Sequence, residues 1–183
     1  MFSSEKYIKD QREKSGRRNR FDYLQSLVTE FQDTDNEESK LQILANLGNF
    51  AYDPINFNHL RELNVVDLFI DMLSENNEKF VEFGMAGLCN LCVESTNRDH
   101  IIKNEGVDAI MQCFSSTNEE IVLNAMTTLI YLVTPATRKD IITEEIVDCM
   151  KQLKTSTNPR LKNLATIFLQ LIPVKSTYLI NSN

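Results

Sequence analysis

The stretch Ser-Glu-Asn-Asn-Glu at residues 74–78 returns in altered form at nearly fixed distances along the chain. Ser-Ser-Thr-Asn ends at Asn118 and Thr-Ser-Thr-Asn ends at Asn158, while a step of 41 back from Asn77 reaches Asn36. A recurrence of about 40 residues is typical of solenoids made of helical units. The recurrence therefore predicts a stack of repeated helical units.

Three kinds of helix are expected in each unit, because apolar residues recur at helical spacing in three places. A long run follows each recurring Asn, a shorter run opens at a Val-Asp pair, and a still shorter one precedes that pair. The expected long helices are 41–51, 80–92, 121–133 and 161–172, the Val-Asp helices open at Val66, Val107 and Val147, and the short helices are 57–63, 98–104 and 138–145.

The recurring Asn suits the position just before a helix, where its side-chain oxygen can accept a hydrogen bond from an unpaired backbone N–H. Glu37, Glu78 and Glu119 follow it, and the positive end of a helix favours a carboxylate there. Pro159 follows in the last unit and fits a first helical position. Gly106 is expected to end the short helix that precedes it.

The predicted fold is all-α, a solenoid of about three and a half helical repeats. One unit cannot bury its apolar face alone, so roughly three or more must stack. Three complete or nearly complete units follow a half-unit at residues 21–52 that serves as a cap. The expected domain is 21–173, between a basic, flexible tail at 1–20 and a C-terminal tail at 174–183.

The charge is distributed unevenly around a net value of −7. Residues 21–148 carry 7 basic and 23 acidic side chains, a balance of −16, whereas residues 1–20 carry 7 basic and 3 acidic ones. A body this acidic repels phosphate backbones, which argues against direct nucleic-acid binding by the solenoid. For Arg17, Arg18 and Arg20 two interpretations stay open: contact with RNA or a nuclear-import signal, and an ordinary solvated tail.

Cysteine usage and hydropathy indicate a protein of a reducing compartment with no membrane association. The longest apolar run near the C-terminus, 165–174, is too short to span a bilayer, and no secretory signal is recognised. Cys89, Cys92, Cys113 and Cys149 lie on expected helices in apolar company, as free thiols do. Cys89 and Cys92 form a CxxC without the second pair that a zinc site needs, so core packing is expected.

No catalytic constellation is recognised. His59 and His100 are 41 residues apart, so they are read as equivalent solenoid positions and not as partners in one site. Adjacent glutamates such as Glu37 and Glu38 diverge on a helix and do not form an acid–base pair. The sequence predicts a protein that is not an enzyme and has no cofactor or metal.

Leu47-Gly48-Asn49-Phe50 and Leu88-Cys89-Asn90-Leu91 resemble the signature of an armadillo repeat. The resemblance implies a right-handed armadillo-type α-solenoid of about three and a half repeats. Its groove is lined by the last helix of each unit, where the Asn binds the main chain of an extended partner. Nuclear-import adaptors of this class also place a Trp four residues before that Asn, but this chain has no Trp. The candidate partner-binding residues are Asn49, Asn90, Tyr131, Glu82 and Thr127.

A closer resemblance covers residues 23–32, 44–54 and 80–92, which are similar to an armadillo-repeat family of the minor spliceosome. It implies a non-catalytic nuclear scaffold that holds an RNA-recognition-motif protein similar to RNA-binding motif protein 48 and supports pre-mRNA splicing. The cytoplasm is a second expected location. The alternative is a general armadillo adaptor that binds an extended peptide of a cytosolic or nuclear partner.

Overall fold

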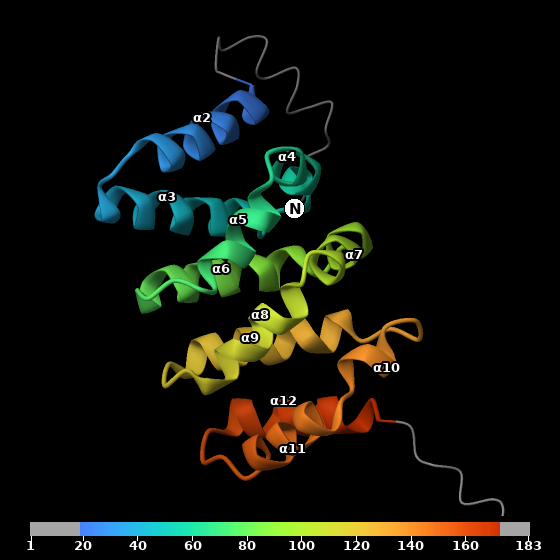
Figure 1. The fold of residues 1–183 in the computed structure, drawn as a ribbon. Coiled ribbons are helices and arrows are strands. Elements are labelled where there is room, and N and C mark those ends of the chain that lie inside the picture. Colours follow the sequence, from blue (N-terminus) through green and yellow to red (C-terminus); the bar gives the residue numbers. More distant parts are fainter. Residues whose placement is uncertain (1–18, 173–183) are drawn as a thin grey trace, which may run out of the picture.

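The computed structural model describes residues 19–172, and within that range the chain forms helices and no strand (Figure 1). The helices lie in successive layers along one axis, and the two ends of the described chain lie at opposite ends of the stack. The elements are α2 (Arg20–Asp33), α3 (Glu37–Phe50), η1 (Pro54–Asn56), α4 (Phe57–Glu62), α5 (Val65–Met72), α6 (Glu78–Leu91), α7 (Ser95–Lys103), α8 (Gly106–Gln112), η2 (Cys113–Ser115), α9 (Glu119–Leu132), α10 (Arg138–Ile141), α11 (Glu144–Leu153) and α12 (Pro159–Gln170).

The predicted three-helix unit is confirmed. The units are α4–α5–α6, α7–α8–α9 and α10–α11–α12, preceded by the half-unit α2–α3. The long helices pack in chain order, α3 on α6, α6 on α9 and α9 on α12, while each middle helix packs on the long helix of its own unit. The described chain is a helical solenoid of about three and a half repeats, as the periodicity predicted.

The recurring asparagines cap the four long helices as predicted. Each side-chain oxygen accepts a hydrogen bond from a backbone N–H in the first turn, which explains why these helices begin directly after the Asn. The apolar runs alone placed the starts two to four residues too late, because the first turn is polar. The four bonds go to Asn36 from Ser39 (2.8 Å), to Asn77 from Lys79 (2.9 Å), to Asn118 from Glu120 (3.1 Å) and to Asn158 from Arg160 (2.8 Å).

The prediction that Gly106 ends the short helix is wrong. Glu105 takes the left-handed conformation with φ of 58°, as Asn64 does 41 residues earlier with φ of 56°, and Gly106 opens α8. Gly106 is needed for a different reason: a Cβ there would lie 2.7 Å from the carbonyl oxygen of Ile101. Close packing of α7 against α8, and not backbone handedness, requires a glycine at this position.

The single short helix predicted at 138–145 is also wrong, because two helices share that range. α10 ends at Ile141, and Thr143 then caps α11 by accepting a hydrogen bond from the N–H of Ile146 at 3.3 Å. A threonine hydroxyl at this position stabilises a new helix start.

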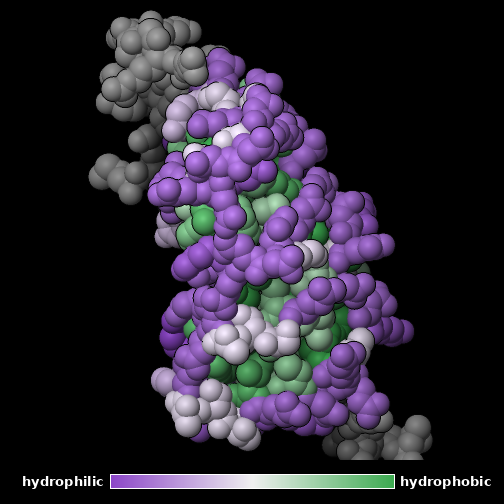
Figure 2. Space-filling view, turned by 60° about the vertical axis from the view of Figure 1, so that its left-hand side comes forward, coloured by the Kyte–Doolittle hydropathy of each residue, from purple (hydrophilic) through white to green (hydrophobic). Residues whose placement is uncertain are grey.

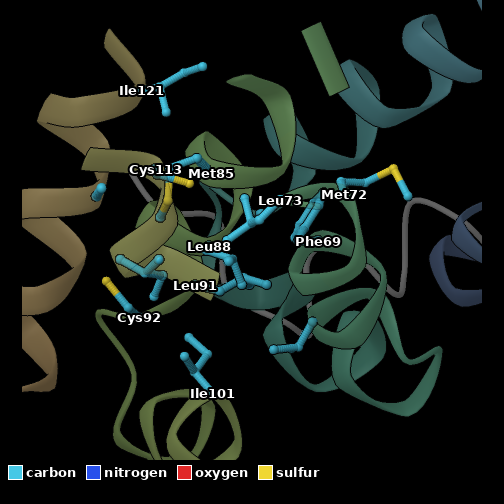
Figure 3. Close-up of a cluster of buried hydrophobic side chains, with 14 of the residues drawn as sticks. Phe69, Met72, Leu73, Met85, Leu88, Leu91, Cys92, Ile101, Cys113 and Ile121 are labelled. Carbon is cyan, nitrogen blue, oxygen red and sulfur yellow. The ribbon is translucent and has the colours of Figure 1, made fainter. Parts of the chain in front are cut away.

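The apolar interior is continuous from one unit to the next. Phe69, Leu88 and Cys113 come from different helices and converge in one cluster of buried side chains (Figure 3). Gly84 lets α6 approach α5 closely, since a Cβ there would lie 2.9 Å from the carbonyl oxygen of Phe69. Each large apolar side chain buried in this way contributes about 1.5–3 kcal/mol, so packing both within and between units stabilises the stack.

Most of the two expected tails, including Arg17 and Arg18, lies outside the described residues. Arg20 belongs to the folded body, because it opens α2 and its guanidinium lies 3.7 Å from the carboxylate of Asp53. No helix in the described part of the chain combines the length and apolar character required to cross a membrane.

Candidate partner-binding surface

The long helices α3, α6, α9 and α12 lie side by side, and the capping asparagines help to hold them there. In Asn77, Asn118 and Asn158 the side-chain oxygen caps its own helix, and the amide nitrogen donates a hydrogen bond to a glutamate of the preceding unit. Sequence analysis found the caps but missed this second bond, which depends on the packing of the units. The bonds join Asn77 to Glu37, Asn118 to Glu82 (3.1 Å) and Asn158 to Glu119 (2.7 Å).

A second periodic contact, also missed from sequence, fixes the chain where it leaves each long helix. Asn56 and Asn97, fully buried and 41 residues apart, occupy equivalent positions. Thr137, a further 40 residues on, supplies a hydroxyl in place of the amide. The recurrence of these polar residues at spacings of 41 and 40 could have predicted this contact from the sequence. The bonds run from Asn56 Nδ2 to Phe50 O (2.7 Å), from Asn97 Nδ2 to Leu91 O (3.1 Å) and from Thr137 Oγ1 to Leu132 O (2.6 Å).

Charged side chains also pair between neighbouring units. Arg61 contacts Glu94 at 2.6 Å, and His100 Nε2 lies 2.7 Å from Asp67 Oδ1. His59, the equivalent of His100, instead packs with its ring edge-on to that of Phe21. Because these polar contacts are partly exposed, each contributes little to stability, but they engage side chains that would otherwise be free to bind a partner.

Asn49, Asn90 and Tyr131 lie at equivalent positions of three consecutive long helices, as the repeat register predicted. Asn49 is exposed on α3, and Asn90 is half-buried on α6. The amide nitrogen of Asn90 donates to the carbonyl oxygen of Gly48 at 3.1 Å. This bond leaves the Asn90 oxygen and its second N–H for a main-chain contact. Whether these residues bind a partner stays a prediction.

Glu82 and Thr127 are half-buried and make hydrogen bonds within the solenoid. Glu82 accepts from Lys79 Nζ at 2.8 Å and from Asn118, so its charge is largely compensated. Thr127 donates its hydroxyl to the carbonyl oxygen of Leu123, one turn earlier on α9, at 2.8 Å. Both residues therefore offer less to a partner than Asn49 or Tyr131 does.

We use the name long-helix face for the surface made by the accessible side chains of α3, α6, α9 and α12 and of the turns that close them. It carries four of the five large hydrophobic side chains exposed within residues 19–172: Tyr52, Val93, Tyr131 and Ile167. Sequence analysis named only Tyr131, although the register places Ile167 at the position of Thr127. Figure 2 shows, on one side of the molecule, hydrophobic surface between hydrophilic side chains, most extensive in the half of the stack that ends with α12.

The thiols are poorly suited to nucleophilic or metal chemistry. Burial raises the pKa of Cys92 to about 12 and that of Cys113 to about 11. Burial also raises the pKa of Cys89 and of Cys149, the latter with help from the nearby Glu145 carboxylate. Thiolates are the reactive form, so few are present at neutral pH. Residues 19–172 contain no group of three or more His, Cys, Asp or Glu side chains placed to hold a metal ion.

Solved structures of armadillo repeat proteins superpose on most of this chain. A crystal structure of computationally designed armadillo repeat proteins for modular peptide recognition matches with a TM-score of 0.74 at 16% identity, covering 82% of this chain and 64% of that chain. A designed armadillo repeat protein in complex with the peptide (KR)4 matches with a TM-score of 0.73 at 14% identity and the same coverage. The fold therefore defines an armadillo-type solenoid protein.

A more specific likeness comes from the sequence. The chain is 57% identical over 67 residues to armadillo repeat-containing protein 7 of Mus musculus, a match that covers 37% of this chain and 34% of that protein. The matched stretch thus spans about a third of the relative. No family model matches the sequence. The match confirms the resemblance to this armadillo protein that the motifs indicated.

Proposed function

We propose that this protein is a non-catalytic scaffold of the minor spliceosome, which holds an RNA-recognition-motif protein similar to RNA-binding motif protein 48 and supports pre-mRNA splicing. The observation that carries this proposal is the 57% identity with armadillo repeat-containing protein 7, in a chain with an armadillo-type fold. The proposal places the protein in the nucleus, with the cytoplasm as a second location.

The charge of the body supports a division of labour between this protein and its partner. Residues 21–148 carry a balance of −16, so the solenoid repels RNA. Proteins that bind nucleic acid carry basic patches, and such a patch is electrostatically complementary to an acidic scaffold, which favours association. In this proposal the partner contacts the RNA and the solenoid holds the partner.

The internal contacts support a structural role. Hydrogen bonds from the capping asparagines, and from the buried Asn56 and Asn97, fix neighbouring units to one another. The thiols have raised pKa values, and the two histidines contact different neighbours, Phe21 and Asp67. The asparagine contacts between units thus favour a rigid surface, as a scaffold requires, and the thiols and histidines offer no reactive pair.

Co-purification tests this proposal. The tagged full-length protein, isolated from nuclear extract, is expected to recover an RNA-recognition-motif protein and the small nuclear RNAs of the minor spliceosome in preference to those of the major one. Nuclease treatment should remove the RNA and leave the protein partner bound, because the contact is between proteins. Recovery of neither partner nor RNA would refute the proposal, as would normal splicing of minor-class introns after depletion of the protein.

The second candidate is a general adaptor that binds an extended peptide, favoured by the structural likeness to designed proteins made for peptide recognition. In this second candidate function, Asn49 and Asn90 bind the main chain of the peptide. The double substitution Asn49→Ala/Asn90→Ala should weaken peptide binding by about 1 kcal/mol for each hydrogen bond lost, as measured by calorimetry. The matched control is Asn76→Ala, in an exposed turn between α5 and α6. Unchanged affinity in the double variant would place the peptide elsewhere.

A further inference from the structure

We propose that Arg20 is a strap that closes onto the buried Asn56 and locks the first layer of the solenoid, α2 and α3, to the unit that follows. In the structure the strap is open. The Arg20 guanidinium lies 3.7 Å from the Asp53 carboxylate, and the side-chain oxygen of Asn56 is buried with no hydrogen-bond partner among the described residues. The inference goes beyond the proposed function, because it concerns how the solenoid holds its own first layer and depends on no partner.

The equivalent contact is closed at the next junction between units. The residues 41 positions further along are Arg61, Glu94 and Asn97. Arg61 donates from Nη1 to Glu94 Oε2 at 2.6 Å and to Asn97 Oδ1 at 2.5 Å. Asn97 Nδ2 donates to the carbonyl oxygen of Leu91 at 3.1 Å. The buried amide of Asn97 is therefore paired through both its oxygen and its nitrogen, and one arginine connects two units.

At the third junction all three members of this contact are replaced together. Ile102 stands at the position of the arginine, Thr134 at that of the acid and Thr137 at that of the asparagine. The Thr137 hydroxyl donates to the carbonyl oxygen of Leu132 at 2.6 Å and accepts from the backbone N–H of Thr134 at 2.9 Å. It is thus paired without an arginine. At these junctions an arginine occurs only where the buried residue is an asparagine, which assigns to Arg20 the task that its equivalent performs.

The chemistry at the first junction favours closing. Asn56 is fully buried, and its Nδ2 already donates to the carbonyl oxygen of Phe50 at 2.7 Å. A buried acceptor that lacks a donor destabilises the fold. The side chains of Arg20 and Asp53 are 25% and 44% exposed, so their ion pair alone contributes little. Because a guanidinium carries several N–H groups, Arg20 can bind the Asn56 oxygen and keep the carboxylate as well.

The position of α2 gives the strap its consequence. Within the described residues α2 is the outermost helix at its end of the stack, and it packs mainly on α3 and α4 (Figure 1). Its buried side chains are Leu24, Leu27 and Phe31. Opening of α2 exposes this apolar face, and helices with few neighbours open most often. A closed strap therefore lowers the frequency at which the first layer opens.

Hydrogen exchange of the full-length protein, followed by mass spectrometry, tests the strap. Arg20→Gln should speed the exchange of the α2 amides about tenfold, which is the effect of losing one hydrogen bond to a charged donor. The amides of α9 should exchange as in the wild-type protein. The matched control is Lys103→Gln, which removes an exposed positive charge at the end of α7 and should leave α2 unchanged.

Two further variants show whether Arg20 acts through Asn56. Asn56→Thr reproduces the residue of the third junction, so adding Arg20→Gln to it should change the exchange of α2 by less than about twofold. Asp53→Asn removes the carboxylate charge and keeps a side-chain oxygen for the N–H of Ile55, which it accepts at 3.2 Å. This variant should speed the exchange of α2 less than Arg20→Gln does, because the exposed ion pair is the weaker contact.

Exchange of α2 within about twofold of wild type in Arg20→Gln would overturn the inference, since Arg20 would then make only an exposed ion pair. An equal effect of Arg20→Gln with and without Asn56→Thr would also overturn it, because Arg20 would act on another group. NMR of the wild-type protein provides a check that needs no variant. The guanidinium protons of Arg20 should exchange slowly with water, as those of Arg61 do, and freely exchanging Arg20 protons would refute a closed strap.

Discussion

At the scale of single residues, two glycines on neighbouring long helices play different structural roles. Gly87 on α6 faces the buried ring of Phe69, which a Cβ at this position would overlap. Gly48, near the end of α3, has room for a Cβ, whose nearest neighbour would be the carbonyl oxygen of Phe83 at an ordinary contact distance of 3.9 Å. The repeat register places Gly48 at the position of Cys89 and Gly87 at that of Asn46, but it does not show how closely a neighbouring helix approaches either glycine.

We expect Gly87→Ala to destabilise the protein by about 1–3 kcal/mol, since an added methyl group forces the Phe69 ring or α6 to move. Gly48→Ala is the matched control and should be neutral or stabilising by up to about 1 kcal/mol, because alanine favours the helix. Urea denaturation followed by circular dichroism measures both. Similar stabilities of the two variants would show that α5 and α6 are not packed so closely.

The candidate binding residues show the same dependence on packing. Asn49 and Asn90 occupy matching positions in nearly identical motifs, and the sequence treats them alike. In the structure Asn90 donates to Gly48 of the preceding unit, whereas Asn49 is exposed. The register could be read from the sequence, but the use of each amide group could not, because it depends on the neighbouring unit.

At the scale of helices, local chemistry determined most of the boundaries. The recurring Asn predicted the starts of the long helices, because a cap depends on residues within one turn of it. The predicted role of Gly106 as a helix end and the single helix predicted at 138–145 were wrong, because the local sequence there fits either the end or the start of a helix. At Gly106 close packing on Ile101 decided the role of the glycine, and Thr143 decided the start of α11.

The double role of the capping asparagine leads to a prediction at this scale. Asn77→Ala removes both the cap of α6 and the bond to Glu37, and should destabilise the protein by about 1 kcal/mol or somewhat more. Asn76→Ala changes the adjacent, exposed residue and should have almost no effect. Thermal unfolding of both variants checks this pair. Equal losses in the two would mean that the cap and the bond between units contribute nothing measurable.

At the scale of the whole molecule, the acidic charge of the body argues against direct RNA binding by the solenoid. Residues 21–148 carry the balance of −16, while the basic residues of the N-terminal region lie mostly outside the described part. The sequence is sufficient for this argument, because long-range repulsion depends on net charge more than on the exact position of each group.

We expect the chain without residues 1–18 to bind single-stranded RNA no better than background in anisotropy titrations. Any binding by the full chain should fall steeply as salt rises from about 0.05 M to about 0.2 M, because it depends on phosphate contacts. Arg17→Gln/Arg18→Gln tests whether those two arginines supply the contacts. Tight RNA binding by the shortened chain would contradict the proposed division of labour and assign RNA contact to the solenoid itself.

The sequence by itself determined the repeat, its period, the three-helix unit, the asparagine caps and the acidic charge of the body. These features follow from short-range rules, namely apolar spacing, capping chemistry and composition, that act within one unit. Only the tertiary structure decided which polar groups pair between units, where glycine permits close packing, and which apolar side chains stay exposed on the long-helix face. Those features depend on the distances between units, which no single stretch of the chain encodes.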